Sequence, residues 1–296
     1  GVDFWGSSRI MIDMINKARA SGVNIYADQY AYNTSGTDGR IVLIPGWLKQ
    51  RLEETGISTE GLSPAELVER GIAQEAVDRD MRLDIDHEIM RRGGAAQILV
   101  LEYPDKTYVG QSLAQLAAAG KCDQVEMAIR LQLMGDRNRP GGVRLRGFSM
   151  SEKDVAALAG QNWTCTSTDA AIALPGDGPV HPRFYGAFPR KLRRFALQQG
   201  LISLEEAVRV STSLTASILG LPERGMVKEG FHADLVVLDP VRLRDRADAF
   251  EPHRYSEGIE QVLVGGELVV DREHYIGKLA GRVLDRNQLR RPVKKD

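Results

Sequence analysis

Apolar residues in the first thirty positions first follow helical spacing and then form a short continuous run. The helical spacing covers 7–20, and Gly22 stands where a helix C-cap is expected. The run 23–28 then predicts a short strand that ends at the carboxylate of Asp28. A helix that leads into a strand ending at a carboxylate is half of a β/α repeat. The residues at helical spacing are Ile10, Met11, Met14, Ile15 and Ala18.

The middle of the chain reads as a series of helices around one apolar run. That run, 97–101, predicts a fully buried strand and a second candidate barrel strand. Gly, Pro, Asn and Asp over 135–142 predict a loop. Helices are predicted at 41–52, beginning beyond Pro45, at 60–93, at 112–119, at 124–133 and at 149–158.

A third buried strand is predicted at 163–168, directly before Asp169, and helices are expected at 189–199 and from 203 to about 219. Beyond Gly230 the pattern changes to apolar runs typical of strands, with a hairpin signal at Gly265-Gly266. We therefore predict an α/β domain over 1–220, with a small insertion around 105–150, and a small β domain over 221–296.

Composition narrows the class of protein. Hydrophobic residues make up 43% of the chain and can fill a sizeable core. A net charge of -1 does not indicate binding to nucleic acid or to an anionic membrane surface. No apolar run approaches the ~18 residues of a membrane span, and 1–30 lack the layout of a signal peptide, so we expect a cytoplasmic protein. Cys122 and Cys165 are expected to be buried free thiols. The expected partner is a small molecule.

Candidate chemistry concentrates in 166–190. A strand ending at Asp169 is followed by His181 and by Arg183 and Arg190 in a stretch rich in Gly and Pro. In an α/β barrel, this arrangement places at the mouth of the barrel an acid that can transfer protons. From the residues alone, Asp169 is equally a turn residue, and Arg183 could pair with a surface carboxylate. Asp28 is more simply explained as a strand-end cap than as a metal ligand.

Six segments in order resemble the D-aminoacylase group, the N-acyl-D-amino-acid deacylases, of the amidohydrolase superfamily. The resemblance implies the C-terminal part of a TIM-like (β/α) barrel followed by a small β-sandwich domain, and zinc-dependent hydrolysis of the amide of N-acyl-D-amino acids. The matching segments are 22–32, 148–154, 167–169, 181–183, 186–190 and 233–237.

The resemblance also assigns roles to residues. Asp169 matches the acid that takes and returns the proton, and it is also our candidate for a metal-site residue. Arg183 matches the residue that binds the substrate carboxylate, and a guanidinium suits a planar carboxylate. Tyr103 is the nearest match to a substrate-holding tyrosine, with a packing role as the alternative. His181 is a candidate for a polar role at the site, with a zinc-ligand role as the alternative.

Most of the family's zinc ligands are expected to lie outside this chain. The strand at 23–28 is followed by Gln29-Tyr30 and no His, and Ala170 stands where the family has Gly. His87 is expected on the surface, and His232, His253 and His274 are expected in structural roles. Because Gly1 is no initiator Met, we expect the chain to begin partway through a larger polypeptide.

Three hypotheses follow. In the first, the chain is the C-terminal portion of the zinc deacylase and requires the missing N-terminal part or a partner subunit. In the second, it is a non-catalytic barrel remnant that acts as a binding or scaffold subunit, which the altered Tyr30-Ala31-Tyr32 and Asp169-Ala170 favour. In the third, it hydrolyses cyclic amides such as hydantoins or dihydropyrimidines, although the His181-Pro182-Arg183 segment favours a free carboxylate.

Overall fold

The computed structural model describes residues 1–34, 41–178 and 180–285. The chain divides into two compact units, which we call unit 1 and unit 2. Unit 1 consists of Gly1–Ser8, Tyr32–Val155 and Gly176–His181. Unit 2 consists of Arg9–Ala31, Ala156–Pro175 and the chain from Pro182 onward. The predicted limits at 105–150 and at 220 stay predictions.

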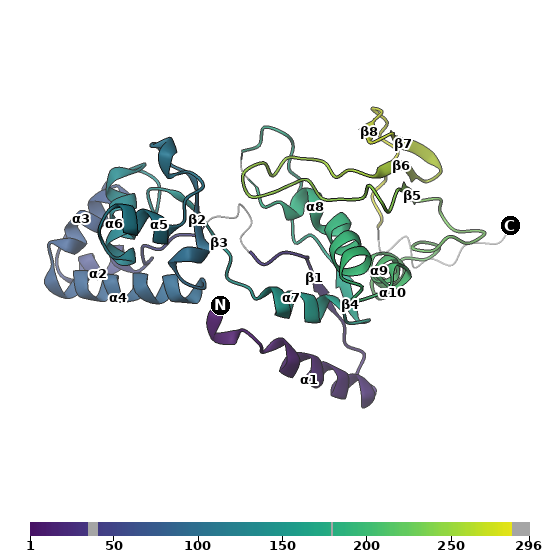
Figure 1. The fold of residues 1–296 in the computed structure, drawn as a ribbon, viewed down its shortest axis with the longest axis horizontal. Helices are drawn as coiled ribbons and strands as arrows, with labels where there is room; N and C mark the ends of the chain where they lie inside the picture. The colour runs from purple at the N-terminus through teal and green to yellow at the C-terminus, as the bar shows by residue number, and fades with distance from the viewer. Residues whose placement is uncertain (35–40, 179, 286–296) are drawn as a thin grey trace. The chain divides into compact units, whose positions relative to one another are not determined.

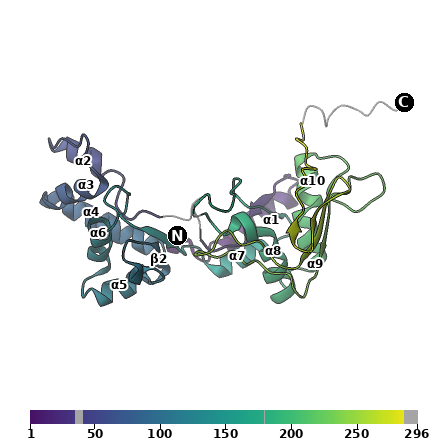
Figure 2. The ribbon, with the colours of Figure 1, turned by 90° about the horizontal axis from the view of Figure 1, so that it is seen from above.

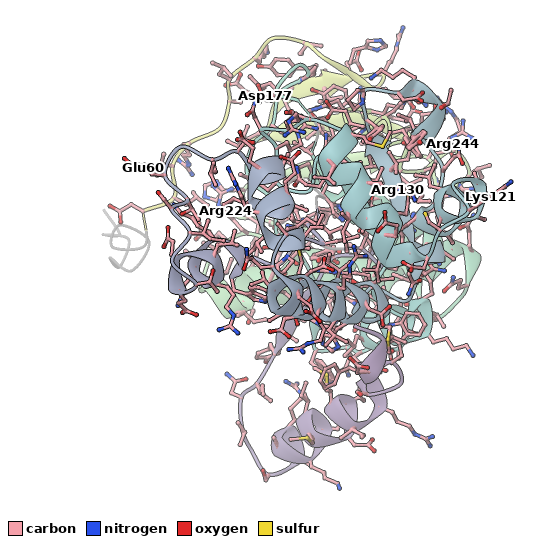
Figure 3. All side chains as sticks on the ribbon, turned by 90° about the vertical axis from the view of Figure 1, so that its left-hand side faces the viewer. Glu60, Lys121, Arg130, Asp177, Arg224 and Arg244 are labelled. Carbon is pink, nitrogen blue, oxygen red and sulfur yellow. The ribbon has the colours of Figure 1, made fainter. Side chains whose placement is uncertain are left out.

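Unit 1 is mainly helical, with one apolar core. Figure 2 shows α3, α4 and α6 packed together, while charged residues such as Glu60 and Lys121 lie on its outside (Figure 3). Every fourth residue of α4 from Val77 to Ile89 is buried, which is the stripe expected of a helix packed on one face. The helices are α2 (Leu48–Glu54), α3 (Pro64–Ile72), α4 (Glu75–Arg91), α5 (Leu113–Ala119) and α6 (Gln124–Met134), with single turns η1 (Val2–Phe4), η2 (Ala95–Gln97) and η3 (Lys106–Tyr108).

Side-chain caps explain where three of these helices begin. Ser63 and Ser112 each form a complete capping box, with Glu66 and Gln115 respectively. Asp123 accepts the backbone N–H of Glu126 at the start of α6. The helices predicted for this region are thus confirmed, and α2 begins at Leu48, beyond Pro45 as expected.

The apolar run 97–101 is a strand, but it is not a barrel strand. It forms β2 (Ile98–Glu102), which pairs antiparallel with β3 (Arg144–Gly147) in a two-stranded sheet of unit 1. A (β/α) barrel requires parallel strands, so the prediction of a second barrel strand was wrong. A continuous apolar run indicates burial on both faces, but only Ile98 and Val100 are fully buried in the core of unit 1, and Leu99 and Leu101 are half-buried.

Unit 2 contains the predicted first and third strands, now paired with each other. β1 (Ala27–Gln29) lies parallel to β4 (Thr164–Thr166), with Asp28 opposite Cys165. α1 (Ser8–Ala20) precedes β1, and α7 (Glu152–Ala159) precedes β4, as Figure 1 shows. Parallel neighbours that follow helices are the expected pattern of an α/β fold. The predicted strand at 23–28 was too long at its start.

The helices after β4 begin and break at places that the sequence did not reveal. α8 (Arg183–Arg190) begins six residues before the predicted start, and it contains Pro189. A π-helix, η4 (Lys191–Gln198), continues it, because proline cannot make the usual backbone hydrogen bond and the helix spacing adjusts. The next predicted helix is two helices, α9 (Leu204–Ser211) and α10 (Ser213–Leu219), broken at Thr212. Figure 1 shows α9 and α10 side by side.

The C-terminal strands form one antiparallel sheet in the order β5-β6-β7-β8. The hairpin predicted at Gly265-Gly266 is confirmed, because these residues connect β6 to β7. The strands are β5 (Leu235–Leu238), β6 (Ile259–Val264), β7 (Glu267–Asp271) and β8 (His274–Tyr275). Within the described ranges, no helix combines the length and apolar character that a membrane crossing requires.

Candidate functional site

The candidate site lies where β1 and β4 end. The Ser167 N–H donates to the Gln29 carbonyl over 3.1 Å, so the two strands are still hydrogen-bonded at their carboxyl ends. Tyr30 follows β1 directly, and Asp169 follows β4 by three residues. The carboxyl ends of parallel strands are where α/β folds place their chemistry. Two segments far apart in the sequence therefore meet at one edge.

Asp169 has a backbone conformation that few residues adopt. Its φ is 46°, in the left-handed region, where Asp and Asn are tolerated better than bulkier residues. Its side chain is 67% exposed, so the carboxylate is open to an approaching molecule. Non-glycine residues in this region are frequent at functional sites, where surrounding contacts hold them in place.

Arg183 supplies such a contact. Its Nη2 lies 2.9 Å from Asp169 Oδ2, and the same nitrogen donates to the backbone carbonyl of Asp169. The Arg183 side chain is only 3% exposed. A nearly buried guanidinium therefore holds both the backbone and the side chain of an exposed carboxylate, which confirms that the two residues lie together.

Tyr30 completes this cluster, and the sequence interpretation missed it. The Arg183 guanidinium lies 4.5 Å from the centre of the Tyr30 ring, a cation–π contact. Burial raises the pKa of the Tyr30 phenol above its ordinary value, and the neighbouring Arg183 partly offsets that rise. The phenol is therefore a neutral donor at physiological pH. Its place directly after a strand, like that of Asp169, was the signal available in the sequence.

The helix that begins with Arg183 is tied down at its other end. Arg190 Nε donates to the Ala31 carbonyl over 2.6 Å, and its Nη1 pairs with Asp245 Oδ2 at 3.1 Å. Lys191, only 1% exposed, donates from Nζ to the Ala159 carbonyl at the end of α7 over 3.0 Å. Burial lowers the pKa of Lys191 to about 8. The Arg190 bond fixes the end of α8 near the end of β1, which is where Tyr30 lies, and the Lys191 bond ties η4 to the end of α7.

Two other predicted site residues belong to unit 1. His181 is fully buried, its Nε2 lies 3.1 Å from the Thr34 carbonyl, and its ring meets Tyr32 edge-on at 5.3 Å. Tyr103 is 5% exposed and stacks on Tyr108 at 5.0 Å. Burial and the neighbouring Tyr108 raise the pKa of Tyr103 to about 12. The substrate-binding roles of both residues stay predictions.

The remaining candidates of the sequence lie as follows. His87 and His274 are exposed, and His232 and His253 are half-buried. Asp28 is exposed in the middle of β1 and not at its end. Cys122 and Cys165 are free, and Cys165 is buried.

The residues present do not make up a metal site. Among residues 1–34, 41–178 and 180–285, no three His, Cys, Asp or Glu side chains come close enough together to hold an ion. Zinc in proteins takes at least three such ligands. Asp169 has an exposed carboxylate and could contribute one.

Comparisons with known proteins agree on one family. Residues 91–270 match the amidohydrolase family. N-acyl-D-glutamate deacylase of Alcaligenes xylosoxydans xylosoxydans is 32% identical over 262 residues, which are 88% of this chain and 42% of the relative. The chain thus spans less than half the length of this relative.

Two solved structures resemble the chain over most of its length. N-acyl-D-glutamate deacylase from Bordetella bronchiseptica, complexed with zinc and a phosphonate inhibitor that mimics the tetrahedral intermediate, has a TM-score of 0.57 and 28% identity. The match covers 90% of this chain and 44% of the Bordetella bronchiseptica protein. A D-aminoacylase crystal structure has a TM-score of 0.61 and 27% identity. The match covers 97% of this chain and 48% of the D-aminoacylase chain. With the family match over 91–270, these likenesses show that the chain belongs to the amidohydrolase family.

Proposed function

We propose that this chain is part of an N-acyl-D-amino-acid deacylase, which hydrolyses the amide of its substrate to a carboxylate and a free D-amino acid. The observation that carries the proposal is the contact between Asp169 and Arg183 at the carboxyl ends of β1 and β4. The names of the relatives support the substrate class, since they are deacylases of N-acyl-D-glutamate and a D-aminoacylase.

Arg183 binds the carboxylate of the substrate. Its guanidinium is nearly buried yet already holds one carboxylate, that of Asp169, so it is placed where an anionic planar group can pair with it. A fixed guanidinium orients the substrate and brings the acyl carbon into a constant position. The Tyr30 phenol, in contact with Arg183, is placed to donate a hydrogen bond to the same substrate.

Asp169 moves the proton. Water adds its oxygen to the acyl carbon and gives a proton to the Asp169 carboxylate, and Asp169 then delivers that proton to the nitrogen as the C–N bond breaks. An exposed carboxylate held by one arginine can do this, because one of its oxygens remains available to the substrate. The amide is consumed, one water is consumed, and a carboxylic acid and an amine result.

We propose zinc as the cofactor, with most of its ligands outside the described residues of this chain. The relative from B. bronchiseptica is complexed with zinc, which supports the proposal. Among the described residues, Asp169 is the ligand that we propose this chain contributes. The described residues by themselves do not fit a complete zinc site, so we derive no step through the metal.

We also propose that β1 and β4 belong to a TIM-like barrel that further polypeptide completes, and that the C-terminal sheet belongs to a β-sandwich. This polypeptide is either more of the same protein or a partner subunit. Each of β1 and β4 pairs with one neighbour in the described part of the chain, and so each leaves an open edge. Three apolar residues of α1, Ile10, Met11 and Met14, are more than half exposed, as surfaces covered by a partner often are when it is absent.

The test is hydrolysis by the protein in its natural assembly. We expect the zinc-loaded assembly to release D-glutamate from N-acetyl-D-glutamate, with little action on the L-enantiomer, and to lose activity when a chelator removes zinc. Zinc content measured alongside should fall with the activity. A metal-free, inactive assembly would instead support a scaffold subunit, and preference for a hydantoin would support a cyclic amidase.

A further inference from the structure

Tyr185 connects three segments of unit 2 around the candidate site. It lies two residues beyond Arg183, in the first turn of α8. Its hydroxyl donates to the carbonyl of Ala173 over 2.9 Å, and Ala173 lies four residues beyond Asp169. The same hydroxyl lies 3.0 Å from His253 Nδ1, which belongs to the segment between β5 and β6.

Burial does little to hold the segment that follows Asp169. Ile172 is 92% exposed and Leu174 is 62% exposed, so neither apolar side chain is packed into a core. The bond from Tyr185 reaches that backbone at Ala173. Arg183 holds Asp169 itself, and Tyr185 holds the chain four residues later, both from the first turn of one helix.

The positions of the protons determine what His253 does. A phenol has one proton, and here that proton is donated to the Ala173 carbonyl. Toward His253 the phenol oxygen can therefore only accept, so the proton between them must be on Nδ1 of His253. If Nδ1 lacked a proton, it would attract the phenol proton away from Ala173.

Further contacts keep the Tyr185 ring in place. Its ring meets those of His253 and Tyr255 edge-on, each with a 5.4 Å separation of ring centres. The Ser256 hydroxyl donates to the Tyr185 backbone carbonyl over 3.3 Å. His253 and Tyr255 thus contact the Tyr185 ring, and Ser256 holds its backbone.

We propose that Tyr185 and His253 are positioning residues for Asp169. His253, protonated at Nδ1, directs the Tyr185 proton to Ala173, and this bond keeps the segment after Asp169 against the helix that begins with Arg183. The inference rests on the proposed deacylase function for its kinetic consequence. Its structural consequence, a hydrogen bond that restrains 170–174, does not depend on that function.

The first experiment compares Tyr185→Phe with Tyr275→Phe in the natural assembly. Tyr275 also donates its hydroxyl to a backbone carbonyl, that of Lys278 over 2.9 Å, but in the C-terminal sheet. Two rates are measured: cutting beside Ile172 and Leu174 by a protease that prefers bulky apolar residues, and hydrolysis of N-acetyl-D-glutamate. Loss of one hydrogen bond is expected to raise the cutting rate about tenfold in Tyr185→Phe and not in Tyr275→Phe.

The kinetic result separates positioning from general damage. Misplacement of Asp169 should lower kcat about tenfold while KM changes less than about twofold, because Arg183 still binds the carboxylate. Equal cutting rates in Tyr185→Phe and wild type would overturn the proposal. If wild type has no deacylase activity, the proposed function fails, and the cutting rates still decide whether the restraint exists.

The second experiment tests the proton on His253. Asn and Asp have nearly the same shape, but an Asn amide can donate to the phenol oxygen, whereas an Asp carboxylate can only accept. We expect His253→Asp to raise the cutting rate at 170–174 as Tyr185→Phe does, and His253→Asn to stay closer to wild type. Nitrogen NMR of wild type should show His253 protonated at Nδ1. A neutral ring protonated only at Nε2, or equal behaviour of the two variants, would contradict the inference.

Discussion

The two units use their buried side chains differently. Unit 1 buries aliphatic residues from α2 to α6 and from β2 in one continuous cluster. In unit 2, a described apolar cluster consists of Cys165, Val210 and Leu214, and Arg183 and Lys191 are nearly buried as well. Burying a charge is costly unless partners compensate it. Both units bury charged side chains, Arg144 and Arg146 in unit 1 and Arg183 and Lys191 in unit 2, but unit 1 combines them with one large apolar core. In unit 2, the buried Arg183 holds the candidate site.

The largest expected effect tests the core of unit 1. Ile85 is fully buried in that core, and Ile85→Ala should lower the free energy of unfolding by about 4 kcal/mol. Val210→Ala in unit 2 should cost about 2 kcal/mol, because it removes less apolar volume from a smaller cluster. Both are measured by chemical denaturation, with Leu83→Ala, exposed on the same helix as Ile85, as the control. Equal costs for Ile85→Ala and Val210→Ala would remove the contrast.

The next effect concerns the buried charge at the site. Arg183→Lys keeps a positive charge but loses the planar fork, so KM for N-acetyl-D-glutamate should rise about a hundredfold, with a smaller change in kcat. Arg209→Lys is the matched control, because Arg209 pairs with Glu206 in α9, away from Asp169. If Arg183→Lys and Arg209→Lys both keep the wild-type KM, then Arg183 serves only to hold Asp169.

The smallest of these effects concerns Lys191 and depends on pH. Its folded-state pKa, about 8, lies below its ordinary value of 10.5. Between those values the unfolded chain binds more protons than the folded one, so the free energy of unfolding rises with pH. Lys191→Met lacks this term, and its stability relative to wild type should fall by about 2 kcal/mol from pH 7 to pH 9.5. Denaturation curves of both proteins at pH 7 and pH 9.5 measure this change. A difference in stability that is the same at both pH values would contradict the account of Lys191 as a buried charge.

Local signals in the sequence predicted local structure well. The helix at 7–20, the hairpin at Gly265-Gly266 and the capping Ser203 all appear as expected, because neighbouring residues determine each of them. Pairing between distant segments was harder. β3 was missed because Arg144 and Arg146 look like surface residues, although the structure buries both. The direction of β2 was missed because an apolar run does not indicate which strand lies beside it.

The same distinction applies to the candidate site. Asp169 and Arg183 are fourteen residues apart and lie in one recognisable stretch, so the sequence placed them together. Tyr30 reaches Arg183 from a distant segment of unit 2, and the parallel pairing of β1 with β4 brings it there. Tyr103 lies directly after β2 in unit 1, and its substrate-binding role stays a prediction.

The central claim, that Asp169 carries the proton of an amide hydrolysis, is tested most directly by Asp169→Asn. The amide keeps the shape but cannot accept the proton, so kcat for N-acetyl-D-glutamate should fall by about a thousandfold. Asp28→Asn, at an exposed aspartate in the neighbouring strand, should keep wild-type kcat. If Asp169→Asn retains more than about a tenth of the wild-type kcat, the account of Asp169 as proton carrier is wrong.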